Sequence, residues 1–366
     1  MSEPTQDQLF SHQYWMQRAI ELARLGQYST KPNPNVGCVI VKEGKLIGQG
    51  YHPKAGQPHA EVFALRQAGE NAKDATAYVT LEPCAHYGRT PPCAEALVKA
   101  QVKKVIIACS DPNPLVAGKG VQILQAAGIE VETGICTETA RKLNFGFLKV
   151  MSTGLPYVRL KVASSLDGRT AMASGESKWI TGAIARQDVQ HWRAISGAVI
   201  TGIQTVLADD CELNVRVLEG VELANIVQPK RIILDRQAQL PLTAKILHNP
   251  ETVMVMTPFR QELDDLGVIQ LAPQPLNQLL QTLSQQYQIY DVLVEAGATL
   301  STAFLQQGLV DEMISYIAPT ILGQSARAMF NAEFSQMAEQ RRFELVDVTQ
   351  LGQDIRLRLL PIQEMI

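Results

Sequence analysis

The chain has 366 residues, of which 46% are hydrophobic and 19% are charged, and its formal net charge is −3 at pH 7. This composition is typical of soluble globular proteins, and the length predicts about two domains. The small acidic excess argues against a nucleic-acid partner, and the lack of an apolar run of about 18 residues argues against a membrane span. The start, "MSEPTQDQLF", has no signal-peptide pattern, and six scattered cysteines do not make a secreted disulfide framework. We therefore expect a cytoplasmic protein with reduced thiols.

In the first part of the chain, predicted strands alternate with predicted helices. Apolar runs indicate strands, and apolar residues at three- or four-residue spacing indicate helices. The predicted strands cover residues 36–41, 75–82 and 103–111, and the predicted helices cover residues 13–27, 59–69 and 93–102. The Gly and Pro residues around "NFGFLKVMSTGLP" predict a boundary near residue 152. We therefore expect one domain over 1–152 and a second over 153–366.

The second part alternates in the same way. Its predicted strands cover residues 157–168, 197–202, 230–235, 252–257 and 290–297, with a helix over 183–195 and a terminal hairpin formed by 343–350 and 354–360. This order predicts a mainly parallel sheet with helices on its faces. A further strand–helix junction follows Glu295, where a predicted helix begins after Gly297. Such a junction either binds a pyrophosphate or is simply a tight turn.

Three residues have the spacing of a catalytic zinc site. Cys84 follows a predicted strand, Cys93 opens a predicted helix, and His59 lies at another predicted helix start. Thiolates are stabilised at helix N-termini. Three protein ligands leave the fourth position of a tetrahedral zinc ion open, which is typical of catalytic sites. We expect one zinc ion per chain, held by these three residues.

Glu61 lies two residues after His59, in the H-x-E pattern of zinc-dependent deaminases. Its carboxylate could take a proton from zinc-activated water and deliver it to a leaving amine. Each of these residues taken alone is more often structural, and only their combination and order favour catalysis. Cys38 and Cys109 lie in strand patterns and are expected in the core, whereas Cys136 and Cys211 carry no motif.

Eight residues, 85–92, separate the two cysteines, where many zinc deaminases have two. With "NPNVGCVIV" at 33–41 and "DPNPLVAGKG" at 111–120, this stretch resembles the deaminase half of the RibD family of bacterial bifunctional riboflavin biosynthesis enzymes. The resemblance continues through "KVASSLDGRTAMASGESKWIT" and "VEAGATLSTAFLQQGLVDE" and covers nearly the whole chain. It implies a three-layer cytidine-deaminase-like α/β domain followed by a dihydrofolate-reductase-like α/β domain.

For the first domain, the resemblance implies hydrolytic deamination of a diaminopyrimidinone, 2,5-diamino-6-(5-phosphoribosylamino)pyrimidin-4(3H)-one. Glu61 would shuttle the proton while ammonia leaves. The loop between the cysteines offers donors and positive charge for the substrate's phosphate. The implied substrate-binding residues are Asn33, His52, His86, Arg89, Thr90 and Asn113.

For the second domain, the resemblance implies NADPH-dependent reduction of the ribosyl group of 5-amino-6-(5-phosphoribosylamino)uracil to ribityl. The implied cofactor positions are Ala163, Trp179, Thr205, Asp209, Arg236, Gly297, Ala298, Thr299, Leu300, Ser301, Thr302 and Ala303. The implied substrate positions are Lys161, Ser177, Arg193, Leu213, Arg216 and Glu295. Arg236 closes the predicted strand 230–235 and could bind a 2′-phosphate. Lys161 and Asp209 are the candidate proton donors. The resemblance also implies a homo-oligomer that acts on small phosphorylated pyrimidines.

Three other hypotheses remain open at this stage. A nucleic-acid-editing deaminase shares the H-A-E and P-C motifs, but it predicts a basic face and two residues between the cysteines. A zinc-stabilised scaffold that binds nucleotides without catalysis has no need of Glu61. A chain with only one active domain would fail one of two assays, for ammonia release or for NADPH oxidation.

Overall fold

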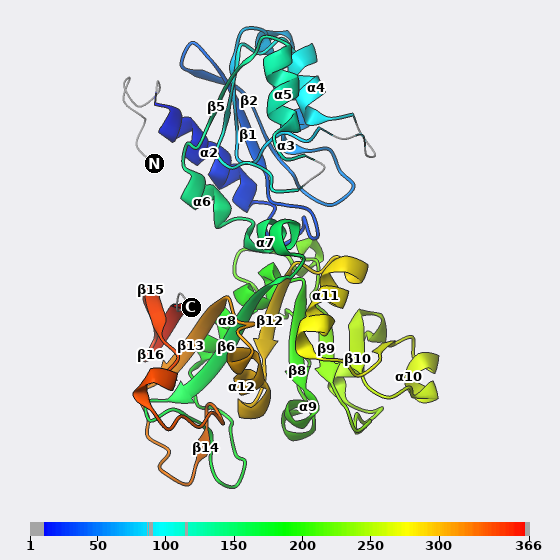
Figure 1. Cartoon of the computed structure of the whole chain (residues 1–366), viewed down its shortest axis with the longest axis vertical. Helices are drawn as coiled ribbons and strands as arrows, with labels where there is room; N and C mark the ends of the chain where they lie inside the picture. The colour runs from blue at the N-terminus through cyan, green and yellow to red at the C-terminus, as the bar shows by residue number, and fades with distance from the viewer. Residues whose placement is uncertain (1–10, 86, 88–90, 114–115, 363–366) are drawn as a thin grey trace. The chain divides into compact units, whose positions relative to one another are not determined.

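The computed structural model describes residues 11–85, 87, 91–113 and 116–362 (Figure 1). The chain divides into two compact units, Met1–Gly154 and Leu155–Ile366, and each unit is described by itself. Within the described residues, every helix is too short or too polar to span a lipid bilayer.

The first unit is built on a five-stranded sheet with the order β2-β1-β3-β4-β5. Its strands are β1 (Gly37–Lys42), β2 (Lys45–Tyr51), β3 (Thr76–Val79), β4 (Lys104–Ile107) and β5 (Glu130–Thr133). β1 is antiparallel to both β2 and β3, whereas β3, β4 and β5 are parallel to one another. The three strands expected in this unit are therefore present, and β2 and β5 are additional edge strands.

Helices cover both faces of this sheet. One face packs against α2 (His12–Arg24), α6 (Thr137–Arg141) and α7 (Phe145–Thr153), and the other against α3 (Ala60–Ala68), α4 (Cys93–Lys99) and α5 (Lys119–Ala126) (Figure 1). A short 3-10 turn, η1 (Gly69–Ala72), follows α3. Side chains alternate along β1, so that Val39 faces α2 and Ile40 faces α3. The expected three-layer cytidine-deaminase-like fold is confirmed.

Strand β2 was not predicted from the sequence, because two glycines interrupt its apolar pattern. A Cβ added at Gly48 would lie 2.2 Å from the carbonyl oxygen of Ala64, and one at Gly50 would lie 2.5 Å from that of Ala60. Helix α3 therefore packs directly on the backbone of β2, which only glycine permits. This close packing fixes α3, whose first turn carries part of the candidate metal site.

Glu82 organises the loops at the carboxyl end of this sheet. Its buried carboxylate accepts hydrogen bonds from the backbone N–H groups of Asp111, Gly118, Gly120 and Val121. The Glu82 carboxylate therefore holds the first turn of α5 and the loop after β4 to each other. Because Glu82 lies two residues before Cys84, this network also fixes the loop after β3 that contains Cys84.

The second unit is built on a nine-stranded sheet with the order β11-β10-β9-β8-β12-β6-β13-β16-β15. Its strands are β6 (Tyr157–Ser165), β8 (Ala198–Gly202), β9 (Lys230–Leu234), β10 (Val253–Met256), β11 (Ile269–Leu271), β12 (Asp291–Glu295), β13 (Glu312–Ala318), β15 (Phe343–Leu351) and β16 (Asp354–Pro361). The first seven strands of this order are parallel, and β16 and β15 are antiparallel additions. The expected parallel sheet and terminal hairpin are confirmed. A separate pair is formed by β7 (Arg169–Ala171) and β14 (Arg327–Ala328).

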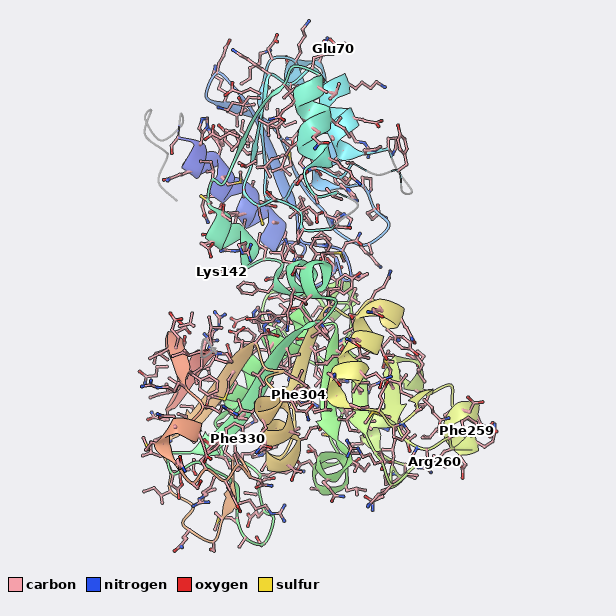
Figure 2. All side chains as sticks on the ribbon, in the orientation of Figure 1. Glu70, Lys142, Phe259, Arg260, Phe304 and Phe330 are labelled. Carbon is pink, nitrogen blue, oxygen red and sulfur yellow. The ribbon has the colours of Figure 1, made fainter. Side chains whose placement is uncertain are left out.

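Helices again cover both faces. α11 (Leu276–Tyr287) and α12 (Ala298–Gln306) pack on one face, and α8 (Ala183–Ile195), α9 (Ile203–Asp209) and α10 (Gln261–Asp265) pack on the other. Phe304 of α12, labelled in Figure 2, is fully buried in the first of these layers. Short 3-10 turns lie at η2 (Leu223–Asn225), η3 (Lys245–Leu247), η4 (Pro250–Thr252) and η5 (Met337–Glu339). The expected dihydrofolate-reductase-like α/β architecture is confirmed.

Replacing Glu82 with Ala tests the network at the end of the first sheet. The change leaves four buried or half-buried N–H groups without their acceptor, and we expect the free energy of unfolding to fall by about 2–4 kcal/mol. Urea unfolding measures the loss, and amide hydrogen exchange of the 116–125 segment should accelerate with it. Glu130→Ala, which removes an exposed carboxylate, is the control. Unchanged exchange in the segment contradicts the assignment.

Candidate active sites

His59, Cys84 and Cys93 meet in the first unit. His59 is the N-cap of α3, Cys93 is the first residue of α4, and Cys84 lies in the loop after β3. His59 Nδ1 lies 3.2 Å from Cys93 Sγ and 3.6 Å from Cys84 Sγ. Two helix starts and one strand end thus bring together residues up to 34 positions apart.

These three side chains fit a zinc ion. All three ligand atoms lie within 4.8 Å of one another. Ligand atoms around a tetrahedral zinc ion with one nitrogen and two sulfurs are separated by roughly 3.5 Å, given Zn–N and Zn–S bonds of about 2.0 and 2.3 Å. The observed separations to His59 match this spacing without rearrangement. One nitrogen and two sulfurs are also the donor set that zinc prefers.

The Cys84 thiol is prepared for deprotonation, whereas the hydrogen bond to Cys84 and burial raise the pKa of the Cys93 thiol. Hydrogen bonds from the Cys93 side chain, from His59 and from the Cys93 backbone N–H hold the pKa of Cys84 well below its usual range. The N–H of Cys93 lies 3.2 Å from Cys84 Sγ. Because zinc binds thiolates rather than thiols, this environment favours the state that a metal requires.

Glu61 is buried beside these residues, in the first turn of α3. Its Oε2 has no hydrogen-bond partner among the residues that the structure describes. Burial raises the pKa of Glu61, and nearby His59 opposes that shift. Burying a carboxyl oxygen without a hydrogen-bond partner costs free energy unless a ligand supplies the missing bond. Its position and raised pKa suit a group that takes and returns a proton.

His52 and Asn33 form a second layer behind the metal group. His52 Nδ1 lies 3.1 Å from the carbonyl oxygen of Pro58 and must donate to it, so that His52 Nε2 accepts from the Asn33 amide at 3.0 Å. Burial lowers the pKa of His52, which keeps this ring neutral. Its ring packs edge-on against His59, with centroids 5.3 Å apart. The bond to His52 uses the Asn33 amide nitrogen and leaves Asn33 Oδ1 for other partners.

Of the remaining expected residues of this site, the structure describes only Asn113. Asn113 is in the loop after β4, where its N–H donates to Asp111 Oδ1. His86, Arg89 and Thr90 lie outside the described residues, so their expected contacts stay predictions. Of the two core cysteines expected in strands, Cys38 is buried in β1. The strand expectation for Cys109 is wrong, because β4 ends at Ile107 and Cys109 is buried just beyond it.

The second unit contains a cavity of about 1450 Å³. Residues that line it follow the carboxyl ends of β6, β8, β9 and β12, which is where parallel α/β sheets bind ligands. Of the expected cofactor and substrate positions, those lining the cavity are Lys161, Ala163, Ser177, Trp179, Arg193, Thr205, Asp209, Leu213, Arg216, Arg236, Glu295, Gly297, Ala298, Thr299, Leu300 and Ala303. Ser301 and Thr302 do not line it.

Ser301 and Thr302 instead stabilise the wall of the cavity. Ser301 Oγ donates to the carbonyl oxygen of Ala296, and Thr302 Oγ1 accepts from the backbone N–H of Asn331. The side-chain amide of Asn331 also donates to Thr299 Oγ1 at 3.0 Å. Asn331 lines the cavity and was not anticipated, because nothing in its local sequence indicates that it meets α12.

Gly297 presents an open surface at the start of α12. The first backbone bond of this helix runs from Ser301 N–H to the carbonyl oxygen of Gly297, and a Cβ added at Gly297 would meet nothing within 4 Å. The N–H groups of the first turn therefore face a space that a phosphate group can enter. The expected strand–helix junction is present, with β12 ending at Glu295 and Gly297 as the N-cap.

Arg193, Glu295 and Lys161 form a buried charge cluster in the cavity wall. Arg193 Nε and Nη2 donate to the two Glu295 oxygens at 2.6 and 3.0 Å, and Lys161 Nζ lies 3.7 Å from Glu295. Burial by itself raises the pKa of Glu295, but Arg193 and Lys161 outweigh it and lower the pKa to about 2. Burial lowers the pKa of Lys161. Arg193 stays a predicted substrate position, and in the structure its guanidinium is bound to Glu295.

Other expected side chains face the cavity more openly. Trp179 is 69% exposed, and the guanidinium of Arg186 lies 4.3 Å from its ring centroid. Ser177 donates to Asp209 Oδ1 at 3.3 Å. Arg216 is half exposed beside Glu212. Arg186 and Lys178 also line the cavity and were missed, because isolated surface cations carry no signal in one sequence.

Comparison with known proteins supports both halves of this description. The family model "Cytidine and deoxycytidylate deaminase zinc-binding region" matches residues 10–109, and "RibD C-terminal domain" matches residues 156–357. The chain is 50% identical to riboflavin biosynthesis protein RibD of Haemophilus influenzae, over 95% of this chain and 96% of the relative.

Solved structures agree. Acinetobacter baumannii RibD superposes with a TM-score of 0.95 at 79% identity, covering 98% of this chain and 99% of that one. A Thermotoga maritima protein, described as a diaminohydroxyphosphoribosylaminopyrimidine deaminase/5-amino-6-(5-phosphoribosylamino)uracil reductase, superposes with a TM-score of 0.86 at 34% identity, covering 96% of this chain and 98% of that one.

The two folds and their sites define a zinc-dependent deaminase joined to an NADPH-dependent reductase. Both act on small molecules. The chain belongs to the RibD family and is a bifunctional deaminase–reductase of riboflavin biosynthesis.

Replacing Glu295 with Gln tests the buried cluster of the second unit. The change leaves Arg193 without its counter-charge, and we expect a loss of about 3–5 kcal/mol in the free energy of unfolding at pH 7. The pKa of Glu295 is depressed on folding, so its contribution is full above about pH 5 and declines as the pH falls below about 4.3 toward 2. The difference between wild type and variant should shrink accordingly.

Urea unfolding between pH 3 and pH 7 measures this difference. Glu21→Gln, which removes an exposed ion pair with Arg18, is the matched control and should change stability little at any pH. A Glu295→Gln variant as stable as wild type at pH 7 would show that the cluster does not stabilise the fold.

Proposed function

We propose that the first domain, over residues 1–152, deaminates 2,5-diamino-6-(5-phosphoribosylamino)pyrimidin-4(3H)-one. His59, Cys84 and Cys93 hold the zinc ion, whose Lewis acidity lowers the pKa of water toward neutrality. The observation that carries this proposal is the unpartnered, buried Glu61 oxygen next to a three-ligand metal group. A purely structural zinc site has four protein ligands and no use for that carboxyl group.

Glu61 acts as the proton shuttle. Its Oε2 takes the proton of the attacking water and passes it to the exocyclic nitrogen, which leaves as ammonia. Burial keeps the pKa of Glu61 above that of an exposed carboxyl group, so the protonated form is accessible between the two steps. Glu61 lies in the first turn of α3, two residues after the N-cap His59.

The substrate ring is oriented by Asn33, whose amide is held by His52 and whose oxygen can accept from a ring N–H. His52 therefore acts through Asn33. Asn113 and the loop residues His86, Arg89 and Thr90 are proposed to bind the rest of the substrate, with Arg89 toward its phosphate.

The second domain, over residues 153–366, is proposed to reduce the ribosyl group of 5-amino-6-(5-phosphoribosylamino)uracil. NADPH supplies the hydride, and the cavity holds both molecules. The first turn of α12 at Gly297–Leu300 binds the pyrophosphate, while Ala163, Thr205 and the exposed face of Trp179 border the rest of the cofactor. Ser301 and Thr302 keep that turn in place, and Ala303 lines the cavity beside it.

Lys161 is the proposed proton donor in the reduction. It lies in the cavity wall, its pKa is lowered by burial, and Glu295 holds its ammonium group. Proton donation at neutral pH becomes easier as the pKa of a lysine falls. Asp209 accepts from Ser177 and is the alternative donor. Arg216, Ser177 and Leu213 border the substrate, and Arg193 positions Glu295.

Arg236 is proposed to bind the 2′-phosphate of NADPH. It is exposed in the cavity wall just beyond β9, and it has no ion-pair partner among the described residues. The strand itself ends at Leu234, one residue earlier than the predicted strand 230–235. A free guanidinium at this end of the sheet offers the two-pronged donor geometry that phosphate prefers.

Replacing Glu61 with Gln tests the deaminase mechanism. We expect ammonia release to fall by roughly 10²–10⁴-fold, because the amide cannot carry the proton. Zinc content, and NADPH oxidation with separately supplied deaminated substrate, should stay at wild-type levels. Glu70→Gln is the control, since Glu70 is exposed in η1 (Figure 2). Ammonia release at the wild-type rate from the Glu61 variant excludes this mechanism.

We also infer that the chain forms a homo-oligomer through the β15 edge. β15 ends the nine-stranded sheet and exposes Leu345, Val346 and Val348. An exposed apolar edge strand readily pairs with another copy. Val348→Lys is expected to reduce the mass in solution to that of one chain in light scattering, whereas Leu266→Lys, at the exposed C-cap of α10, should not. A wild-type monomer would refute the inference.

The cytoplasm is the proposed site of action. All six cysteines are free thiols, and two of them belong to the metal group. Reducing compartments preserve such thiols, whereas an oxidising one favours disulfides between them.

A further inference from the structure

The loop that follows β9 has a fixed conformation. Asp235 is fully buried, and its two carboxylate oxygens accept the N–H groups of Gln239 and Leu240 at 2.9 and 2.8 Å. The N–H of Asp235 donates to the carbonyl oxygen of Met256 at the end of β10. The loop 235–240 is therefore held from inside by one acid, while Arg236 and Gln237 line the cavity.

The same loop contains an unfavourable backbone conformation. Ala238 has a φ of 54°, in the left-handed region that residues with a Cβ rarely adopt. Such conformations persist only where surrounding contacts fix them. The loop therefore needs an external anchor as well as Asp235.

Arg260 provides this anchor from outside the cavity. Its Nη1 donates to the carbonyl oxygens of Leu240 at 2.6 Å and Ala238 at 3.4 Å. Its own backbone is held by the side-chain amide of Gln270, which accepts from the Arg260 N–H at 2.8 Å and donates to the Arg260 carbonyl oxygen at 2.9 Å. Figure 2 labels Arg260 beside Phe259, near α10.

We propose that Arg260 is a positioning residue for Arg236, and through it for the preference of the reductase for NADPH over NADH. This inference rests on the proposed reductase function. Arg260 does not line the cavity, so its effect on the cofactor passes through the backbone of the loop 235–240. A charge-assisted bond to a carbonyl is strong enough to hold a strained turn.

Loss of Arg260 is expected to weaken the binding of NADPH and to leave the binding of NADH nearly unchanged. NADPH differs from NADH in the adenosine 2′-phosphate, and Arg236 is the group offered to it. Loosening the loop moves Arg236 away from that phosphate and leaves the α12 turn, which meets the shared pyrophosphate, untouched. If Arg260 only stabilised the fold, its substitution would weaken the binding of NADPH and of NADH together.

The test measures KM for NADPH and for NADH in the full chain, with the deaminated substrate present. We expect Arg236→Ala to raise KM for NADPH at least about tenfold, and Arg260→Ala to raise it roughly five- to tenfold, because each weakens a charge-assisted contact. KM for NADH and both kcat values should change less than about twofold. Arg260→Lys, which keeps one donor near Leu240, should fall between wild type and Arg260→Ala.

A double variant makes the test sharper. If Arg260 acts through Arg236, adding Arg260→Ala to Arg236→Ala raises KM for NADPH no further. Glu262→Gln is the control, since Glu262 is an exposed partner 4.0 Å from Arg260 Nε and leaves the carbonyl bonds intact.

Equal rises in KM for NADPH and NADH, or full additivity in the double variant, would overturn the proposal. Should Arg260→Ala not fold, the same comparison on Arg260→Lys decides between these outcomes. A wild-type chain that oxidises neither cofactor would instead contradict the proposed reductase function, independently of Arg260.

Discussion

The deaminase half depends on one geometric constraint. The starts of α3 and α4 and the loop after β3 must bring three metal-ligand atoms together. His59 begins α3, Cys93 begins α4 and Cys84 follows β3, and their donor atoms come within a few ångströms of one another. Helix starts supply partial positive charge, which stabilises thiolates. Much of the surrounding packing serves this meeting point, including the glycines of β2 beneath α3 and the Glu82 carboxylate beside Cys84.

The reductase half uses a different device, the carboxyl edge of a parallel sheet. The carboxyl-terminal parts of β6, β9 and β12 border the cavity. Lys161, Arg236 and Glu295 therefore line the same cavity although they are far apart in the sequence. Charge is distributed unevenly along this edge. The pairing of Arg193 with Glu295 neutralises one cation, while Arg236 remains unpaired among the described residues and is held in place by its backbone.

Sequence reasoning found the elements whose signals are local. The helix at 183–195 and the terminal hairpin follow from periodicity, and the three metal-group residues follow from motif spacing. It missed β2, whose glycines are explained only by the closeness of α3, and it placed the end of β9 too late because Asp235 looks like a strand residue until its carboxylate is seen capping the loop. The sequence implied only a substrate position for Arg193, and it could not show the pairing with Glu295, which lies 102 residues away.

The most direct test of this account is X-ray absorption at the zinc edge on the full chain, purified without added metal and with its zinc content measured. The account predicts one zinc per chain, bound by two sulfurs at about 2.3 Å and by nitrogen or oxygen neighbours at about 2.0 Å. Substituting Cys84 should remove one of the two sulfurs from that shell. A chain that holds no zinc and gains none when it is supplied, or a shell of four sulfurs, would contradict it.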